Sequence, residues 1–243
     1  MGRSKNGTSG KTKPEKPKVV RRHVRLKKEH LLHVKLRQTQ EKYLRTISNN
    51  EVTLCHGPAG TSKTFTACFT ALTLLAEKKI KQIILCKPIQ ESGEKLGHLP
   101  GGVDEKIEPF MQSFVSNLRK IIGDEITQRL LDRGIIEFKP LAYMRGDTYD
   151  DCLMILDEAQ NCTFKQLMLF ITRMGKTSKV VIAGDVSQYD IPKAQAGLPG
   201  FIELLTGIKG VSSFKFNEDD IVRAEILKDI VNKYNKWKAE NNI

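Results

Sequence analysis

The 243-residue sequence lacks the features that mark membrane-spanning and secreted proteins. No apolar run approaches the roughly 20 residues that a helix needs to cross a bilayer. The N-terminus has no apolar segment of the kind that a signal peptide contains. The five cysteines form no CxxC pair, and no cysteine or carboxylate completes a metal-binding set with His30 and His33. We therefore expect a cytoplasmic protein with reduced, mostly buried thiols and no membrane contact.

Acidic residues are scarce in the first part of the chain. Residues 1–37 hold 13 Lys and Arg but two Asp and Glu, so this segment carries +11 of the total net charge of +12. Residues 1–18 are rich in Gly, Ser, Lys and Pro, a composition typical of disorder. We interpret residues 1–35 as a basic, partly disordered arm that precedes a domain at 36–243. Such an arm attracts nucleic acid, although a solvated tail that only aids solubility has the same composition.

The chain does contain a glycine-rich turn between an apolar run at 52–55 and a predicted helix at 65–77. Its residues are Gly57, Pro58, Ala59, Gly60, Thr61, Ser62, Lys63 and Thr64. Strand, glycine-rich turn and helix together predict a phosphate-binding loop, the alternative being an ordinary turn before a helix. In such a loop backbone N–H groups cradle the phosphates, Lys63 reaches the β- and γ-phosphates, and the Thr64 hydroxyl binds Mg²⁺. Ser62 stands where the consensus has glycine.

Apolar runs alternate with helical patterns along the rest of the chain, which predicts an α/β fold with a parallel sheet. The predicted strands are 52–55, 80–86, 135–140, 153–156 and 180–183, with a further edge strand at 214–216. The predicted helices are 36–47, 65–77, 103–133 with a break at Gly123-Asp124, 163–174 with Thr163 as cap, and 219–239. We expect Tyr234 and Trp237 of the last helix to pack in the core. Ligands of such a sheet bind at the carboxyl ends of its strands.

Polar residues follow two of the predicted strands. Asp157 and Glu158 come directly after four apolar residues at 153–156, the form of a Walker B strand. Asp157 would hold Mg²⁺, and Glu158 would orient or deprotonate the attacking water. Gln188 follows the next strand and is a candidate sensor of the γ-phosphate, with capping of the next helix as the alternative.

Five segments in order give the chain a resemblance to the PhoH-like family of P-loop ATPases. They are 57–64, 94–97, 140–146, 155–161 and 184–188, within a resemblance that covers residues 36–235. The resemblance implies a three-layer RecA-like P-loop NTPase core, in a short form without the nuclease domain of some relatives. It also implies ATP and Mg²⁺ as ligands, with Gln40 reading the adenine edge.

The resemblance further implies nucleic-acid contacts and assembly. Lys87, Lys95 and Arg145 fall in segments where related motors touch a nucleic-acid backbone. Arg223 resembles a late arginine of the family. Because it stands at the start of a predicted terminal helix, we expect it to complete the site of a neighbouring subunit in a homo-oligomeric, hexameric ring, with Arg173 as the alternative.

Three functions remain open from the sequence. The first is an ATPase that acts on RNA or single-stranded DNA as a ring, with helicase-like or remodelling activity. The second is an ATP-dependent adaptor or switch that controls a partner protein such as a nuclease. A small-molecule kinase is weaker, because no acceptor pocket or lid can be identified. Stimulation of hydrolysis by nucleic acid separates the first two.

Overall fold

The computed structural model describes residues 26–88 and 103–222, together with residues 230, 233, 234, 236, 237 and 240. Its centre is one sheet of six parallel strands in the order β3-β2-β4-β5-β1-β6. The strands are β1 (Val52–His56), β2 (Gln82–Cys86), β3 (Ile136–Phe138), β4 (Cys152–Leu156), β5 (Lys179–Gly184) and β6 (Val211–Lys215). All strands run in the same direction, so their carboxyl ends meet at one edge. β5 separates β1, which precedes the glycine-rich loop, from β4, which precedes Asp157.

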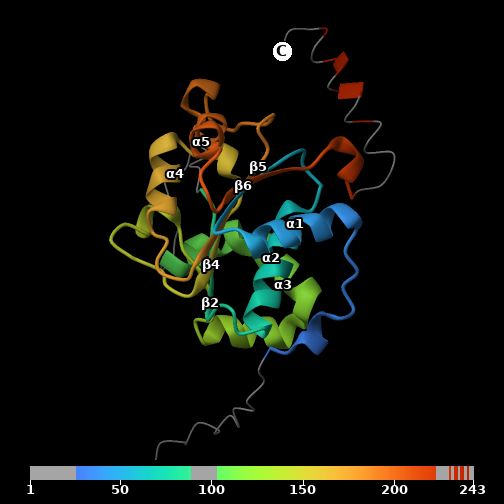
Figure 1. The fold of residues 1–243 in the computed structure, drawn as a ribbon, viewed down its shortest axis with the longest axis vertical. Helices are drawn as coiled ribbons and strands as arrows, with labels where there is room; N and C mark the ends of the chain where they lie inside the picture. Colours follow the sequence, from blue (N-terminus) through green and yellow to red (C-terminus); the bar gives the residue numbers. More distant parts are fainter. Residues whose placement is uncertain are drawn as a thin grey trace, which may run out of the picture.

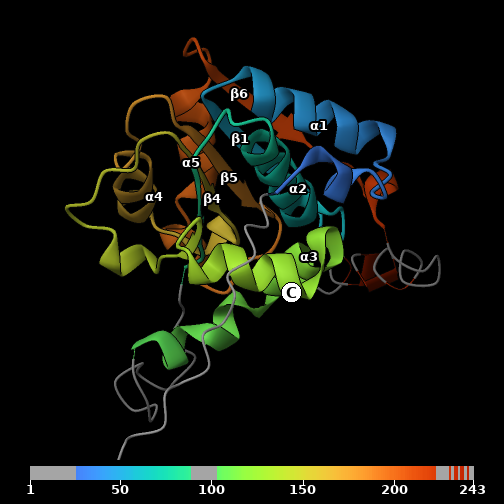
Figure 2. The same cartoon turned by 90° about the horizontal axis from the view of Figure 1, so that it is seen from below.

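Helices cover both faces of the sheet (Figures 1 and 2). One face carries α1 (Gln38–Asn49), α2 (Lys63–Ala76) and α3 (Val103–Asp132), and the other carries α4 (Phe164–Ile171) and α5 (Leu198–Leu205). Short 3-10 helices lie at Lys28–Leu31, Leu141–Tyr143, Ala159–Asn161, Lys193–Gln195 and Glu218–Asp220. The three layers confirm the predicted α/β sandwich.

Each central strand is buried on both sides. In β2, Ile83 and Leu85 pack in the core beneath α1, α2 and α3, whereas Ile84 and Cys86 pack beneath α4 and α5. Both faces of the strand need apolar side chains, so the sequence shows a continuous apolar run instead of an alternating pattern. All five cysteines are free and buried, and burial raises the pKa of the Cys55 thiol to about 12.

Local signals in the sequence predicted several boundaries correctly. Gly123 has φ 76° and ψ 166°, which breaks the helical path inside α3 as predicted. The Thr163 hydroxyl accepts a hydrogen bond from the N–H of Gln166 and caps α4. The predicted edge strand at 214–216 begins earlier, at Val211, and pairs with β1.

The predicted terminal helix differs from the structure at its start. Residues 218–220 form a 3-10 turn, and Ile221 and Val222 that follow it are not helical. Core packing of Tyr234 and Trp237 was predicted wrongly, because they are 55% and 49% exposed. The helices of the two layers already cover both faces of the sheet, and these two rings stack on each other with centroids 6.3 Å apart.

The folded part of the chain includes residues before position 36. Leu26 and Leu31 are each 5% exposed and belong to the core beneath α1, α2 and α3. Lys28 also pairs with Glu77 at the end of α2, with 2.7 Å between Nζ and Oε1. Residues 1–25 lie outside the described residues.

We predict that Leu31→Ala lowers the free energy of unfolding by about 2–5 kcal/mol, because it leaves a cavity under α2 and α3. The matched control is Leu32→Ala, since Leu32 is 75% exposed. Removing that side chain should change the free energy by no more than about 0.5 kcal/mol. Urea unfolding of both variants measures the difference. Equal effects would show that this segment does not belong to the core.

Candidate functional site

The glycine-rich loop leaves the carboxyl end of β1 and enters α2. Lys63 Nζ donates hydrogen bonds to the carbonyl oxygens of Gly57 at 2.7 Å and Pro58 at 2.8 Å. The ammonium therefore lies against the backbone of its own loop. A Cβ atom at Gly57 would come within 2.6 Å of the Phe216 carbonyl oxygen, so this close approach requires glycine. The loop thus packs directly on the segment that follows β6.

Ser62 adopts the left-handed conformation, with φ 64° and ψ 30°. Glycine enters this region without steric cost, whereas an L-residue with a Cβ atom pays about 1–2 kcal/mol. Serine in place of the consensus glycine therefore adds conformational strain to the loop.

Thr64 and Asp157 bring two oxygen donors together. Thr64 Oγ1 donates a hydrogen bond of 2.8 Å to Asp157 Oδ1 at the end of β4. Burial raises the pKa of the Asp157 carboxyl, as does the charge of Glu158, while Lys87 and Thr64 act in the opposite direction. A hydroxyl and a carboxylate at one point suit Mg²⁺, which binds few protein oxygens and keeps several waters. This pair fits the predicted metal ligands.

Glu158 follows Asp157 and has a protein group near each of its carboxylate oxygens. Its backbone is left-handed, with φ 54° and ψ 37°. Gln160 Nε2 donates a 2.7 Å hydrogen bond to Glu158 Oε2. Lys87 Nζ lies 4.0 Å from Glu158 Oε1 and 3.9 Å from Asp157 Oδ2. The structure thus places Lys87, predicted as a nucleic-acid contact, beside the two carboxylates.

Asp185, at the end of β5, joins the loop to Glu158. Its Oδ2 accepts a hydrogen bond of 3.1 Å from the N–H of Ala59, and its own N–H donates to Gln160 Oε1 at 3.0 Å. A Cβ atom at Gly184 would lie 2.9 Å from the backbone nitrogen of Gln160, so glycine is needed there. A chain of hydrogen bonds therefore runs from the phosphate loop through Asp185 and Gln160 to Glu158.

The chain matches the sequence pattern of the PhoH-like proteins over residues 34–235. It belongs to the PhoH-like family. It is 44% identical to the PhoH-like protein of Bacillus subtilis over 198 residues, which are 81% of this chain and 62% of that protein. It is 32% identical to protein PhoH of Escherichia coli K12, over 81% of this chain and 56% of that one. The chain thus spans about three fifths of the length of these curated relatives.

Solved structures with a similar arrangement are distant from this PhoH-like chain. The Sulfolobus solfataricus SWI2/SNF2 ATPase core in complex with dsDNA has a TM-score of 0.45 and 12% identity, over 75% of this chain and 45% of that one. The Pif1 helicase of Candida albicans has a TM-score of 0.39 and 15% identity, over 76% of this chain and 40% of that one.

A cavity of about 1400 Å³ opens beside the loop of this PhoH-like chain. Gly57, Pro58 and Ala59 line it on one side, and the segment around Asp185 and Gln188 lines it on the other. Gln188 is exposed there, and no hydrogen bond between its side chain and the loop is present. Half-buried His56 also lines this cavity, and burial lowers its pKa, assisted by the charges of Lys215 and Lys63.

Other predicted site residues lie elsewhere. Gln40 is 7% exposed, and its Oε1 accepts a hydrogen bond of 2.8 Å from the N–H of Arg37 at the start of α1. Arg145 is exposed on the turn after Leu141–Tyr143. The rival arginine, Arg173, donates to the carbonyl oxygens of Leu169 and Asp147. Lys95 and Arg223 lie outside the described residues.

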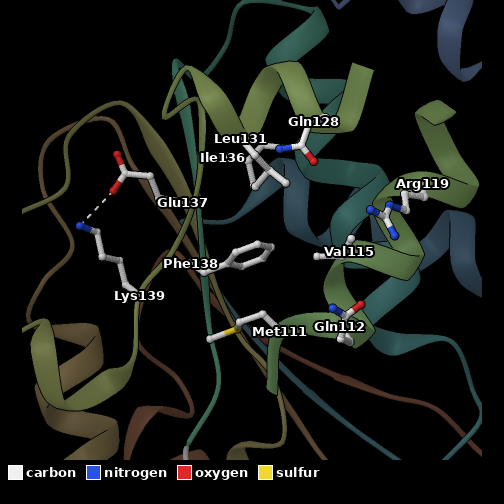
Figure 3. A pocket seen from close by; sticks show the side chains of 10 residues that line it. All are labelled: Met111, Gln112, Val115, Arg119, Gln128, Leu131, Ile136, Glu137, Phe138 and Lys139. Atoms are coloured by element: carbon white, nitrogen blue, oxygen red, sulfur yellow. Dashed lines mark ion pairs between the residues drawn. The ribbon is translucent and has the colours of Figure 1, made fainter. Parts of the chain in front are cut away.

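A second cavity, of about 490 Å³, lies between α3 and β3 (Figure 3). Ile136 and Phe138 of β3 point into it, whereas Glu137 and Lys139 point away and pair with each other. Arg119 at its rim pairs with Asp124 at 2.8 Å. The charged groups around this cavity therefore already have partners. In the described ranges, no helix combines the length and apolar character of a membrane span.

We predict that Ser62→Gly stabilises the protein by about 0.5–1 kcal/mol, because relief of the left-handed strain exceeds the added entropy of the unfolded chain. Ser62→Ala is the matched control, since alanine keeps the strain and loses only the hydroxyl. Thermal and urea unfolding of the three proteins give the comparison. A glycine variant no more stable than the alanine variant would contradict the assignment of strain.

Proposed function

We propose that this PhoH-like chain is a Mg²⁺-dependent ATPase that acts on RNA or single-stranded DNA. The proposal is carried by the 2.8 Å hydrogen bond between Thr64 Oγ1 and Asp157 Oδ1. This bond joins the phosphate loop to the carboxylates at the end of β4, the two parts that hydrolysis of a nucleoside triphosphate requires. Bound Mg²⁺ would neutralise charge on the β- and γ-phosphates at this point.

The residues of this chain take separate roles in the proposed reaction. When ATP binds, Lys63 gives up its hydrogen bonds to the carbonyl oxygens of Gly57 and Pro58 and donates to phosphate oxygens instead. The loop N–H groups orient the triphosphate. Water attacks the γ-phosphorus, the bond to the ADP oxygen breaks, and a carboxylate oxygen of Glu158 takes the proton of the water. Gln188 faces the same cavity and would contact the γ-phosphate. Gln40 would read the adenine edge, as the family resemblance implies.

We predict that Glu158→Gln lowers kcat for ATP hydrolysis by at least about 10²-fold, because the amide cannot accept the proton. Affinity for ATP should change by no more than a few-fold, since the loop is untouched. Steady-state hydrolysis and binding of a fluorescent ATP analogue measure the two quantities. EDTA should abolish turnover of the wild type, whose reaction needs Mg²⁺.

Two variants control this experiment. Glu203→Gln makes the same chemical change at an exposed position of α5 and should hydrolyse ATP as the wild type does. Lys63→Ala should lose ATP affinity as well as turnover, because Lys63 binds the phosphates. If Glu158→Gln hydrolyses ATP at the wild-type rate, Glu158 is not the general base.

The nucleic-acid part of the proposal is supported by charge. Residues 1–25 hold nine Lys and Arg and one Glu, and Arg145 is an exposed cation on the turn that follows Leu141–Tyr143. Phosphate backbones attract such groups without regard to base sequence. The alternative function, a nucleotide-dependent adaptor, predicts ATP hydrolysis that RNA and single-stranded DNA leave unchanged.

We predict that deletion of residues 1–25 flattens the salt dependence of nucleic-acid binding. If about six charges of the arm contact phosphates, the affinity of the full chain falls roughly 10²–10³-fold between 50 and 200 mM salt. The deletion stops before Leu26, because that side chain is buried in the core. Fluorescence anisotropy with a single-stranded oligonucleotide measures both slopes.

An arm of scrambled order and identical composition is the control for this deletion. It should keep the salt slope of the full chain, because the attraction depends on charge. If the salt dependence of affinity is unchanged in the deleted protein, the arm is a solvated tail that does not bind nucleic acid.

The hexameric ring and the role of Arg223 are proposals that rest on the family resemblance. From its position in the sequence, Arg223 was expected to lie far from its own loop. Its neighbour Val222, however, donates a hydrogen bond of 2.8 Å to the Gly60 carbonyl of the same chain. This contact brings the start of that segment to its own phosphate loop, so the expectation that Arg223 must act on a neighbouring subunit loses its premise. Mass measurement in solution, with and without ATP, tests the ring.

A further inference from the structure

Glu158 has no carboxylate oxygen without a protein neighbour. Gln160 donates to Oε2 at 2.7 Å, and the ammonium of Lys87 faces Oε1 at 4.0 Å. A general base must come within hydrogen-bond reach of the water whose proton it takes. In this arrangement Glu158 is directed towards Gln160 and Lys87. These two contacts therefore restrain the orientation of the carboxylate that would take the proton.

The sheet places Lys87 where it can hold Glu158. Lys87 follows β2, and β2 pairs with β4 so that Cys86 lies opposite Leu156. The N–H of Asp157 donates to the Cys86 carbonyl at 3.0 Å, which fixes the two strand ends side by side. Lys87 Nζ also donates to Ser113 Oγ of α3 at 3.1 Å. The lysine is thus positioned by two elements and reaches both carboxylates.

The side chain of Lys87 is still accessible from outside. It is 17% exposed, and Glu158 is 49% exposed. The turn that follows β3, the strand beside β2, carries exposed Tyr143 and exposed Arg145. A cation and an aromatic ring on one turn suit the phosphates and bases of a single strand. A phosphate that reaches the carboxyl end of β2 competes with Glu158 for the ammonium of Lys87.

We propose that Lys87 is a positioning residue that restrains Glu158, and that a phosphate of bound single-stranded nucleic acid releases Glu158 by pairing with Lys87. This inference rests on the proposed ATPase function. Lys87 acts through Glu158 and does not touch the reacting atoms. It makes hydrolysis slow in the absence of nucleic acid and faster in its presence, without a change in the phosphate loop.

The experiment measures ATP hydrolysis by the full chain with and without a 20-nucleotide single strand, in RNA and DNA form. In Lys87→Met the rate of ATP hydrolysis without nucleic acid should rise about two- to fivefold, because loss of a partly exposed ion pair changes a rate by up to about this factor. The ratio of stimulated to unstimulated rate should fall to about one. ATP affinity should stay at the wild-type value, which places the effect on kcat.

Lys81→Met is the matched control. Lys81 precedes the same strand β2 and pairs with Asp151 at the opposite edge of the sheet. It should keep both the unstimulated rate and the stimulation ratio of the wild type. Lys87→Arg keeps the positive charge and should retain most of the stimulation.

The outcomes separate this inference from the function on which it rests. A Lys87→Met protein with the wild-type stimulation ratio, whatever its unstimulated rate, overturns the role of Lys87 and leaves the ATPase proposal standing. An equal proportional fall of the Lys87→Met rates with and without nucleic acid also overturns this role. It would show that the charge of Lys87 supports hydrolysis and does not restrain Glu158. A wild type that does not hydrolyse ATP, or is not stimulated by either strand, contradicts the proposed function and the restraint with it.

Discussion

The position of β5 between β1 and β4 is the constraint on which the site depends. Neighbouring strands lie about 4.8 Å apart, so the phosphate loop and the Asp157-Glu158 pair start two strand spacings from each other. Thr64, at the start of α2, crosses this distance on one side through its hydrogen bond to Asp157. Asp185 and Gln160 cross it at the end of β5 itself. The strand order therefore creates both the metal-binding pair and the link from the loop to the base.

The sequence was sufficient to predict the parts of this site that depend on local order. A strand, a glycine-rich turn and a helix follow one another in the chain, so the loop could be predicted without knowledge of the sheet. Asp157 and Glu158 stand directly after a strand buried on both faces, which also predicts their place at the carboxyl edge. The break at Gly123 and the Thr163 cap are local in the same sense.

The remaining features depend on which strands are neighbours, and one sequence does not contain that information. Lys87 lies 70 positions before Asp157 and meets it only because β2 pairs with β4 in the observed register. Gln160 was visible in the motif, but its partner Asp185 belongs to another strand. Gly184 gave a usable signal, because a glycine at the end of a buried strand indicates a close approach. Tyr234 and Trp237 were misassigned because helical spacing does not show whether a face of the sheet remains to be covered.

Among the residues that the structure describes, the charged groups around the loop and Glu158 already have partners within the chain. Lys63 donates to carbonyls of its own loop, the Ala59 N–H donates to Asp185, and Glu158 contacts Gln160 and Lys87. A triphosphate that enters must replace some of these contacts, so the free energy gained is the difference between two sets of hydrogen bonds. Its negative charge also approaches the Asp185 carboxylate, the partner of Ala59. The link from Asp185 through Gln160 to Glu158 then makes the loop and the base parts of one hydrogen-bonded unit, whose members respond to substrate together.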